Sequence, residues 1–427
     1  VERASLTEAL HTPGAGQPKG LALLHRMEEN PPRQVYDLPA LETLLGRRLR
    51  VSPSQLEKYY TCRYGYFLQY VLGLKPRKRA ELSADQSGTL MHWVLQMALD
   101  PHPGPDNPCA ALQPYLELDD EAMAALAGLL VDEYAKRFLP EDTARFAYLL
   151  SRLKKSMTGL LCYLRDEQNQ SRFRPVACEL KIGSGADAVP GQLYHLSDGR
   201  TVQLIGTVDR ADEWVEEDGT RWVRVVDYKT GTKKLDLKEV YCGLDCQMLL
   251  YLFSLTRDPS GRFTGAEPAG VLYLPAKSPV AAISPLADEA QAAGIRLKEL
   301  KMNGLLIDDP AVVSAMEQEA AGGFIPAKLT AKGEFDSRSS SLASLVQFGQ
   351  LKKRMEKLLT AMAESLRGGR IEAKPVKSKE KTACQYCPYR SICGHDDDGP
   401  ARLLISRKNS EIFQELEKDE TSAGASD

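Results

Sequence analysis

The sequence has no long uninterrupted apolar segment and no export signal. A bilayer-spanning helix needs about 18 or more consecutive apolar residues, and no such run occurs. The N-terminus, Val1-Glu2-Arg3-Ala4, lacks both the apolar core of a secretory signal and an initiator methionine. We therefore expect a cytoplasmic protein, and a fragment or processed product of a longer chain.

The sequence also lacks the Gly-x-x-x-x-Gly-Lys-Ser/Thr loop that cradles ATP phosphates, so an ATP-driven motor is expected to lie elsewhere. Neither charge sign is in large excess: 55 Lys and Arg residues face 58 Asp and Glu residues, a formal net charge of −3. Because nucleic-acid binders are often basic overall, this balance argues mildly against DNA, although local patches decide the question better than the sum.

Cysteine occurs nine times, an odd count, in a chain without an export signal. A disulfide framework is therefore less expected than a metal or cluster site. The 427 residues are 43% hydrophobic and 26% charged, an ordinary globular balance. The length predicts two or three domains, or one large decorated domain with a sizeable core.

Local composition divides the chain into three parts. We interpret residues 1–39 as a linker or N-terminal extension with one short helix near 21–27. Residues 40–405 form the main domain in this interpretation, and residues 406–427 a C-terminal helix with a disordered acidic tail.

Periodicity predicts the elements of the main domain. β-branched and aromatic residues indicate strands at 176–182, 202–214, 222–228 and 270–274. Amphipathic patterns predict helices over about 40–47, 52–72, 88–99, 119–138, 142–167, 238–256 and 341–367. Ser52, Pro53 and Gln55 form a helix-start signal for the second of these helices.

The strongest chemical pattern lies on the two strands that flank a predicted turn at Asp218-Gly219. The first strand carries Asp209, and the second carries Asp227 and Lys229. With the turn centred there, facing residues have numbers that sum to about 437, so Asp209 lies within about one residue of Asp227. Asp227 and Lys229, two apart on one strand, point to the same face.

Two converging carboxylates repel each other unless a cation lies between them. Mg²⁺ is a natural occupant, because it uses one or two carboxylates together with water and phosphate. Lys229 beside such an ion could orient or help deprotonate a water, or neutralise a phosphate. The pattern therefore indicates phosphodiester hydrolysis, and the alternative is a structural Asp227–Lys229 salt bridge on an edge strand.

Three further polar residues stand in apolar surroundings. His92 follows Gly88 by four positions, and is either a core histidine or a metal ligand beside the aspartates. Gln247 and Tyr251 lie four apart on one helix face. They form either a polar stripe on a buried helix or a pair that holds Lys229 or the DNA backbone.

The ordered motifs Gly88-x-x-x-His92, Gly206-x-x-Asp209-Arg210, Asp227-Tyr228-Lys229 and Gln247-x-x-x-Tyr251 resemble the RecB-type branch of the PD-(D/E)xK nucleases. The resemblance implies an α/β fold of the restriction-endonuclease type, with a mixed sheet flanked by helices. It assigns the metal to His92, Asp209, Asp227 and the Tyr228 carbonyl, with Lys229 catalytic and Gln247 and Tyr251 accessory. Glu179 is either an outer carboxylate of the site or, more simply, structural.

A cysteine cluster follows near the C-terminus, with Cys384, Cys387 and Cys393 in the spacing C-x₂-C-x₅-C. Three thiolates this close can bind one centre, and a closed site needs a fourth ligand. His395 nearby or the distant Cys62 could supply it. Spacing alone does not separate zinc from iron–sulfur. The other cysteines are interpreted as packing thiols: Cys109, Cys162, Cys178, Cys242 and Cys246.

A lone upstream cysteine with three far downstream is similar to the pattern of iron–sulfur nucleases. The sequence around Cys62 and around Cys384–Cys387 resembles the AddAB family of bacterial helicase–nucleases, over about residues 40–405. The resemblance implies a [4Fe–4S] cluster on Cys62, Cys384, Cys387 and Cys393. It also implies that this chain degrades the 5′-terminated strand of unwound DNA beside an AddA partner, in double-strand break processing and recombinational repair.

Two short basic runs are candidates for phosphate contact: Lys75 with Arg77, Lys78 and Arg79, and Arg152 with Lys154 and Lys155. Tyr64, Tyr66 and Phe67 could offer stacking surfaces, or pack around the cluster. The alternative for both runs is a solvated helix face. Two other functions compete with the exonuclease: a non-catalytic module with a nuclease-like fold, and a CRISPR-adaptation type of iron–sulfur nuclease, which the length disfavours.

Overall fold

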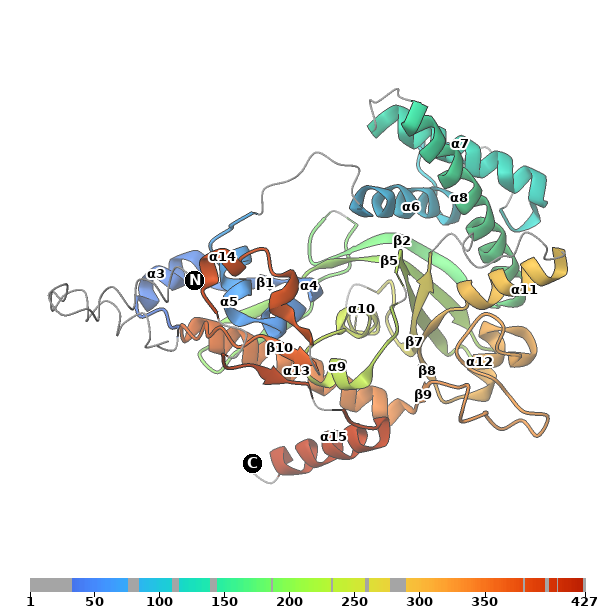
Figure 1. Ribbon diagram of the computed structural model, residues 1–427. Coiled ribbons are helices and arrows are strands. Elements are labelled where there is room, and N and C mark those ends of the chain that lie inside the picture. The colour runs from blue at the N-terminus through green and yellow to red at the C-terminus, as the bar shows by residue number, and fades with distance from the viewer. Residues whose placement is uncertain are drawn as a thin grey trace, which may run out of the picture.

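The computed structural model describes residues 33–75, 84–109, 115–138, 144–185, 187–231, 233–257, 261–276, 289–378, 381–395, 399–404 and 406–424 (Figure 1). The helix expected near residues 21–27 lies outside the described residues. So do Arg77, Lys78 and Arg79 of the first basic run.

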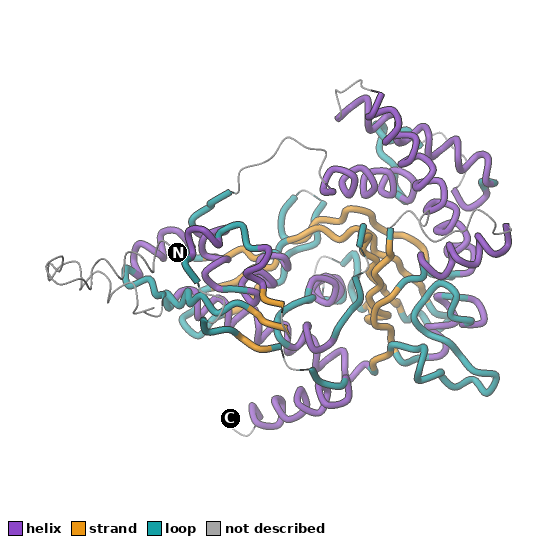
Figure 2. The backbone as a smooth tube through the Cα atoms, in the orientation of Figure 1, coloured by secondary structure: helices purple, strands orange, loops and turns teal. Residues whose placement is uncertain are grey.

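Strands and helices alternate along the chain (Figure 2). The strands are β1 (Arg48–Val51), β2 (Arg174–Ile182), β3 (Leu193–His195), β4 (Thr201–Leu204), β5 (Gly206–Val215), β6 (Arg221–Lys229), β7 (Ala266–Pro275), β8 (Asn303–Ile307), β9 (Leu342–Ala343), β10 (Val376–Ser378), β11 (Lys381–Thr382) and β12 (Arg402–Leu403). The α-helices are α3 (Leu38–Leu45), α4 (Pro53–Thr61), α5 (Arg63–Tyr66), α6 (Ala84–Leu99), α7 (Asp120–Phe138), α8 (Ala144–Gln170), α9 (Leu237–Tyr241), α10 (Gln247–Leu255), α11 (Glu289–Leu300), α12 (Pro310–Met316), α13 (Leu345–Arg367), α14 (Arg390–Cys393) and α15 (Asn409–Gly424). Short tighter or wider helical segments are η1 (Phe67–Val71), η2 (Tyr115–Glu117), η4 (Gln318–Ala320) and η5 (Ala383–Tyr386).

The central sheet has six strands in the order β2-β5-β6-β7-β8-β9. It is mixed: β6 pairs parallel to β7 and β8 parallel to β9, while the other neighbours are antiparallel. This mixed sheet with helices around it confirms the predicted α/β class. Two three-stranded sheets, β1-β4-β3 and β11-β10-β12, lie outside it.

The predicted β5–β6 hairpin is present, and Gly219 occupies its turn with φ of 89°. Arg210 pairs with Val226 and Ala211 with Val225, so facing residue numbers sum to 436 rather than 437. The one-residue difference places Asp209 level with Asp227. The turn therefore brings the two aspartates to neighbouring positions, as the sequence predicted.

Three predicted elements are interrupted. The expected strand 202–214 is two strands, because the chain leaves the β1-β4-β3 sheet at Leu204 and enters the central sheet at Gly206. The expected helix 238–256 breaks between α9 and α10, where Gly243 has φ of 85°. A Cβ on Gly243 would lie 2.4 Å from Cγ of Tyr60, so the break lets the backbone pass that ring.

The expected helix 52–72 begins as predicted, with Ser52 and Gln55 in a reciprocal capping box. It does not run on to residue 72. Cys62 has extended backbone angles (φ −166°, ψ 116°), so α4 ends there and α5 and η1 follow in a new direction. The helix expected to open at Gly88 begins four residues earlier, at Ala84.

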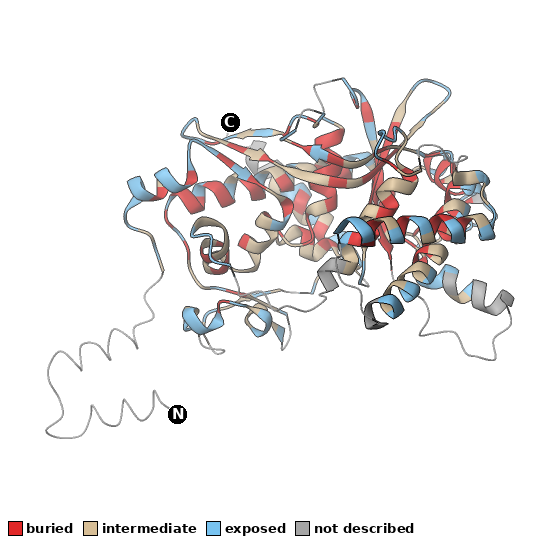
Figure 3. Ribbon diagram, turned by 90° about the horizontal axis from the view of Figure 1, so that it is seen from above, coloured by how far each residue is buried: buried red, intermediate tan, exposed pale blue. Residues whose placement is uncertain are grey.

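Helices cover both faces of the central sheet. α10 packs on β6 and β7, and α13 lies over α10 (Figure 1). Helices α6, α7 and α8 pack together beside β2, and α11 and α12 contact β7 and β8. The buried side chains concentrate in the sheet and its covering helices (Figure 3). None of the helices in the described ranges combines the length and apolar character needed to cross a bilayer.

The first and last described segments lie side by side. In Figure 1 the elements from α3 to α5 lie beside β10, α14 and α13. Arg402 donates to the Tyr60 carbonyl, and the Tyr389 hydroxyl donates to the Leu74 carbonyl at 2.7 Å. The tail expected to be disordered is helical through Gly424, in α15, which packs on α13 and α9 and buries Ile412.

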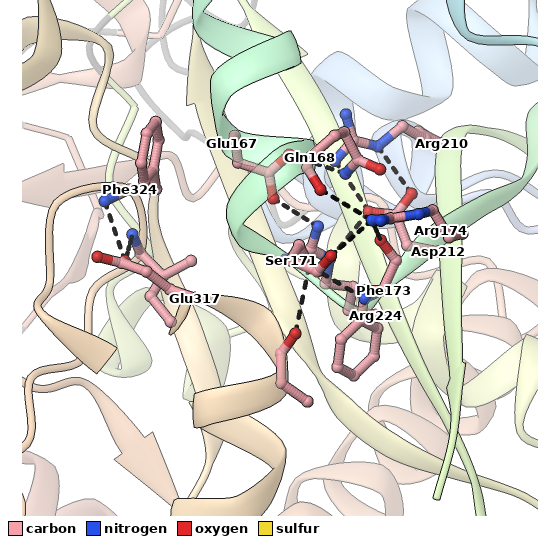
Figure 4. A network of polar contacts seen from close by, with 12 residues as sticks. Glu167, Gln168, Ser171, Phe173, Arg174, Arg210, Asp212, Arg224, Glu317 and Phe324 are labelled. Atoms are coloured by element: carbon pink, nitrogen blue, oxygen red, sulfur yellow. Dashed lines mark hydrogen bonds and ion pairs between the residues drawn. The ribbon is translucent and has the colours of Figure 1, made fainter. Parts of the chain in front are cut away.

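A charge network is sealed beneath β5 and β6, on the face opposite the two aspartates (Figure 4). Arg210 Nε lies 2.8 Å from Asp212, and Arg224 contacts both Asp212 (2.9 Å) and Glu167 of α8 (2.6 Å). All four side chains have no exposed surface. Two cations thus balance two anions, and the network attaches α8 to the sheet.

We expect Arg224→Met to lower the free energy of unfolding by roughly 3–5 kcal/mol, because it leaves Asp212 and Glu167 buried with a single cation. Urea denaturation followed by circular dichroism measures the change. The control is Arg257→Met, which removes a partly exposed ion pair with Glu356 and should cost less than about 1 kcal/mol. Equal small losses in both variants would contradict a stabilising role for the network.

Candidate active site and cysteine pocket

Three carboxylates form a row across neighbouring strands. Cys178 of β2 pairs with Arg210 and Leu180 with Val208, so Glu179 is the strand neighbour of Asp209. Asp209 in turn lies level with Asp227 of β6. The sequence predicted the Asp209–Asp227 neighbourhood, but it favoured a structural role for Glu179. The structure instead places Glu179 at the site.

The backbone at Glu179 is unusual. Its φ is +48°, a left-handed conformation that non-glycine residues rarely adopt. Such residues cost about 1–3 kcal/mol and cluster at functional sites. No sequence signal marks this residue, because the register between β2 and β5 depends on tertiary packing.

His92 of α6 closes the site from outside the sheet. Its Nδ1 lies 3.4 Å from Asp209 Oδ2 and 3.5 Å from Glu179 Oε1, and its Nε2 lies 3.2 Å from the Tyr228 carbonyl oxygen. Among the described residues, His92, Glu179 and Asp209 are the one group of three potential ligands whose atoms all lie within 4.8 Å of one another. His92 is therefore part of the site rather than an isolated core histidine.

Asp227 is held by two side chains. Lys229 Nζ lies 2.7 Å from its Oδ2 and 3.0 Å from its Oδ1, and Gln247 Nε2 donates to Oδ1 at 2.8 Å. Asp227 is almost wholly buried, whereas the Lys229 side chain is 27% exposed. The Lys229 ammonium can thus face both the carboxylate and a molecule arriving from solvent. Gln247 holds Asp227 rather than Lys229 or DNA.

Tyr251 has a packing role. A Cβ on Gly206 would lie 2.6 Å from the Tyr251 ring, so glycine is needed where β5 begins. Burial raises the pKa of the Tyr251 hydroxyl, although the Thr207 amide donates to it and opposes the rise. Tyr251 therefore fixes the start of the strand that carries Asp209.

The electrostatics of the site favour a bound cation. Burial, and then the neighbouring charge of Asp227, raise the pKa of Asp209 to about 7. Burial raises the pKa of Asp227 as well, against the opposing effect of Lys229. Burial would lower the pKa of His92, but Glu179, Asp209 and Asp227 outweigh it and raise that pKa. The carboxylates thus draw protons, and a divalent cation could replace those protons.

The donor set also fits a hard cation. It offers carboxylate oxygens, a backbone carbonyl and one imidazole, which suit Mg²⁺ or Mn²⁺. Asp227 Oδ2 is buried and has no hydrogen-bond partner of good geometry, although the Lys229 ammonium is near. A buried carboxylate oxygen left in this state is available to a metal ion.

A second pocket is lined by the four cysteines that the resemblance selected. Cys62 reaches it from the junction of α4 and α5, Cys384 and Cys387 from η5 and its end, and Cys393 from α14. His395 lines the same pocket. The fold thus brings residues more than 300 positions apart to one place, as the sequence predicted.

The surroundings of the cysteines favour thiolates. Burial raises the pKa of the Cys62 thiol, but the backbone amides of Gly65 and Tyr64 donate to it and oppose this rise. Arg33 Nη1 donates to Cys393 Sγ at 3.0 Å, and Arg33 also donates to the Cys393 carbonyl. Hydrogen bonds of this kind stabilise a ligating sulfur and tune a bound centre.

The remaining cysteines lie elsewhere. Cys246 is buried, and Cys109, Cys162, Cys178 and Cys242 are partly buried. Burial raises the pKa of Cys109 and of Cys162 to about 11, which fits packing thiols. In the second basic run Lys154 pairs with Asp132 at 2.6 Å, whereas Arg152 and Lys155 are exposed. Lys75 is exposed too.

Comparison with known proteins agrees with this geometry. The sequence profile of the PD-(D/E)XK nuclease superfamily matches residues 50–394. The chain therefore belongs to the PD-(D/E)XK nuclease superfamily.

Its relatives carry the name of an ATP-dependent helicase/deoxyribonuclease, of which each is the subunit designated B. The chain is 30% identical over 419 residues to the protein of Clostridioides difficile (strain 630), covering 94% of this chain and 34% of that protein. It is 32% identical over 376 residues to the protein of Anoxybacillus flavithermus, covering 86% and 32% respectively. The chain thus spans about a third of the length of these relatives.

We expect Asp209→Asn to stabilise the metal-free protein at pH 8 by roughly 1–3 kcal/mol. The folded-state pKa of Asp209 is about 7, against an ordinary 3.8. Between these values the folded protein binds more protons than the unfolded chain, so wild-type stability falls as the pH rises through this window. The Asn variant lacks this contribution. Thermal melts at pH 4 and pH 8 measure it.

The control is Asp218→Asn in the exposed turn. The Thr220 amide lowers the pKa of Asp218, so this variant should show no gain at pH 8. The same melts with added Mg²⁺ should stabilise the wild type and not Asp209→Asn. An Asp209→Asn variant that is less stable than the wild type at pH 8 without metal would contradict the assignment.

Proposed function

We propose that this chain is a Mg²⁺-dependent DNA exonuclease domain. One observation carries the proposal: the β5–β6 hairpin puts Asp209 beside Asp227, and Lys229 reaches the same face from two residues along the strand. Membership of the PD-(D/E)XK nuclease superfamily supports it. Hydrolysis of a phosphodiester bond is the chemistry that this set of groups can perform.

The cation would be held by Asp209, Asp227, His92 and the Tyr228 carbonyl, with Glu179 as a further carboxylate. When bound, Mg²⁺ supplies an activated water and neutralises charge on the phosphate. The chain's own groups do the remaining work. Gln247 fixes the orientation of Asp227, and the partly exposed Lys229 ammonium stabilises the negative charge that develops on a phosphate oxygen.

The substrate and partner follow from the relatives. Their name joins a helicase to a deoxyribonuclease. We propose that this chain supplies the nuclease of an AddAB-type helicase–nuclease that processes double-strand breaks for recombinational repair. An AddA partner would carry the motor and a second nuclease, and this chain would cut the 5′-terminated strand.

The cysteine pocket is proposed to hold a [4Fe–4S] cluster on Cys62, Cys384, Cys387 and Cys393. A tetrahedral zinc site with Zn–S bonds near 2.3 Å would bring its sulfurs to about 3.8 Å from one another. Within the described residues no three of these cysteine sulfurs lie within 4.8 Å of one another, although all four line one pocket. This wider spacing fits a centre with several iron atoms better than a single zinc ion.

We expect Lys229→Met to reduce cleavage of end-labelled single-stranded DNA at least about 100-fold, because one preorganised charge near the reacting phosphate contributes that much. The matched control is Lys234→Met, an exposed lysine a few residues later, which should cleave at the wild-type rate. Cleavage by Lys229→Met at the wild-type rate would contradict the proposed role. A clean wild-type protein that does not cleave with Mg²⁺ would instead indicate a non-catalytic DNA-binding module.

We expect Cys387→Ser to lose most of the bound iron and the visible absorbance that an iron–sulfur cluster gives. The control, Cys109→Ser, replaces a partly buried cysteine away from the pocket and should keep both. Iron and acid-labile sulfide are measured on anaerobically purified protein. A colourless wild-type protein that contains zinc would contradict the cluster.

A further inference from the structure

We propose that Glu57 is a positioning residue that couples the helix bearing Cys62 to the orientation of Asp227. The inference rests on the proposed function, because it takes Asp227 as part of the cation site. It adds a connection between the two sites, which are otherwise separate pockets built from different elements.

The connection begins on α4. This helix starts at the Ser52 capping box and ends at Cys62, so Glu57 lies in its middle and Cys62 forms its C-terminal boundary. Glu57 Oε1 accepts hydrogen bonds from the backbone amides of Cys246 (2.8 Å) and Gln247 (3.1 Å). These amides lie at the start of α10, which follows almost 190 residues later in the chain.

The start of α10 has no cap of its own. Cys246 stands at the N-cap position but makes no side-chain capping bond. The first amides of a helix need an acceptor, and a carboxylate there is stabilised by the helix dipole. Glu57 supplies this acceptor from another element, so the place where α10 begins depends on where α4 lies.

Gln247 carries the connection to the catalytic face. It is the first residue of α10; its backbone amide donates to Glu57, and its side-chain Nε2 donates to Asp227 Oδ1 at 2.8 Å. One residue therefore joins the two carboxylates. Movement of α4 would displace the amide end of Gln247 and, with it, the hydrogen bond that orients Asp227.

Two further contacts support the coupling. Tyr60, also on α4, packs so tightly on Gly243 of the α9–α10 connection that no Cβ fits there. Arg402, from the strand that follows the cysteine segment, donates to the Tyr60 carbonyl. The α4 helix is thus in contact with the cysteine segment at one side and with the start of α10 at the other.

A carboxylate used only to cap a helix at the surface would stay solvated. Glu57 is instead buried, which raises its pKa, and the nearby positive charge of Lys233 opposes that rise. Lys233 in turn pairs with Asp245 at 2.7 Å, next to Cys246. These charges hold Glu57 in place without a bond to Asp227 itself.

The experiment compares Glu57→Ala, Glu57→Gln and Glu317→Ala in the iron-loaded protein. Glu317 is a matched control, because it is also buried and caps backbone amides, those of Gly323, Phe324 and Ile325, away from both pockets (Figure 4). The readouts are Mn²⁺ affinity by electron paramagnetic resonance, the visible absorbance of the cluster, and thermal stability.

We expect Glu57→Ala to weaken Mn²⁺ binding about 10-fold, the usual effect of removing a residue that orients a metal ligand, with cluster absorbance retained. Glu57→Gln keeps an acceptor for both amides and should restore affinity to within about threefold. Glu317→Ala should lose stability without losing Mn²⁺ affinity. If Glu57→Ala fails to fold, Glu57→Asp, which is one methylene shorter, should show the same loss of affinity.

A double-mutant comparison tests the coupling itself. Cys387→Ser should weaken Mn²⁺ binding in the wild-type background and have little further effect in Glu57→Ala, because both changes act through the same connection. Independent, additive effects would overturn the proposal, as would unchanged affinity in Glu57→Ala. If the wild type binds no Mn²⁺ at all, the proposed nuclease function fails instead, and the two outcomes are thereby distinguished.

Discussion

The antiparallel pairing of β5 with β6 is the constraint on which the rest of the structure depends. It sets Asp209 level with Asp227 in a buried position, where two carboxylates repel each other and draw protons. A sheet that carries this repulsion must be held firmly from elsewhere. The sealed network of Arg210, Arg224 and their acidic partners does so from the opposite face of the same two strands.

Both faces of the hairpin are therefore charged, but in different ways. Beneath it, Arg210 and Arg224 balance Asp212 and Glu167, and the network is closed. Above it, Lys229 neutralises only part of the charge of the carboxylate row, which His92 approaches from α6. The closed network serves stability, and the open one leaves room for a cation and a phosphate.

The sequence predicted the parts of the site that depend on local pattern. The Asp218-Gly219 turn determined the hairpin, and with it the Asp209–Asp227 neighbourhood, to within one residue of register. It did not predict Glu179, because strand neighbours that are distant in the chain are set by packing. The helix breaks at Cys62 and near Gly243 were missed for the same reason: apolar periodicity continues through them, while tertiary contacts with other segments turn the backbone. The gathering of four distant cysteines came from the resemblance rather than from the pattern.

The central claim, that the hairpin forms a cation site, is tested most directly by a crystal structure of the protein soaked with Mn²⁺. The account predicts an anomalous scattering peak in contact with carboxylate oxygens of both Asp209 and Asp227 and with the Tyr228 carbonyl oxygen. It also predicts that Gln247 still donates to Asp227 in that structure. A peak that contacts neither aspartate, or no peak at saturating Mn²⁺, would contradict the account.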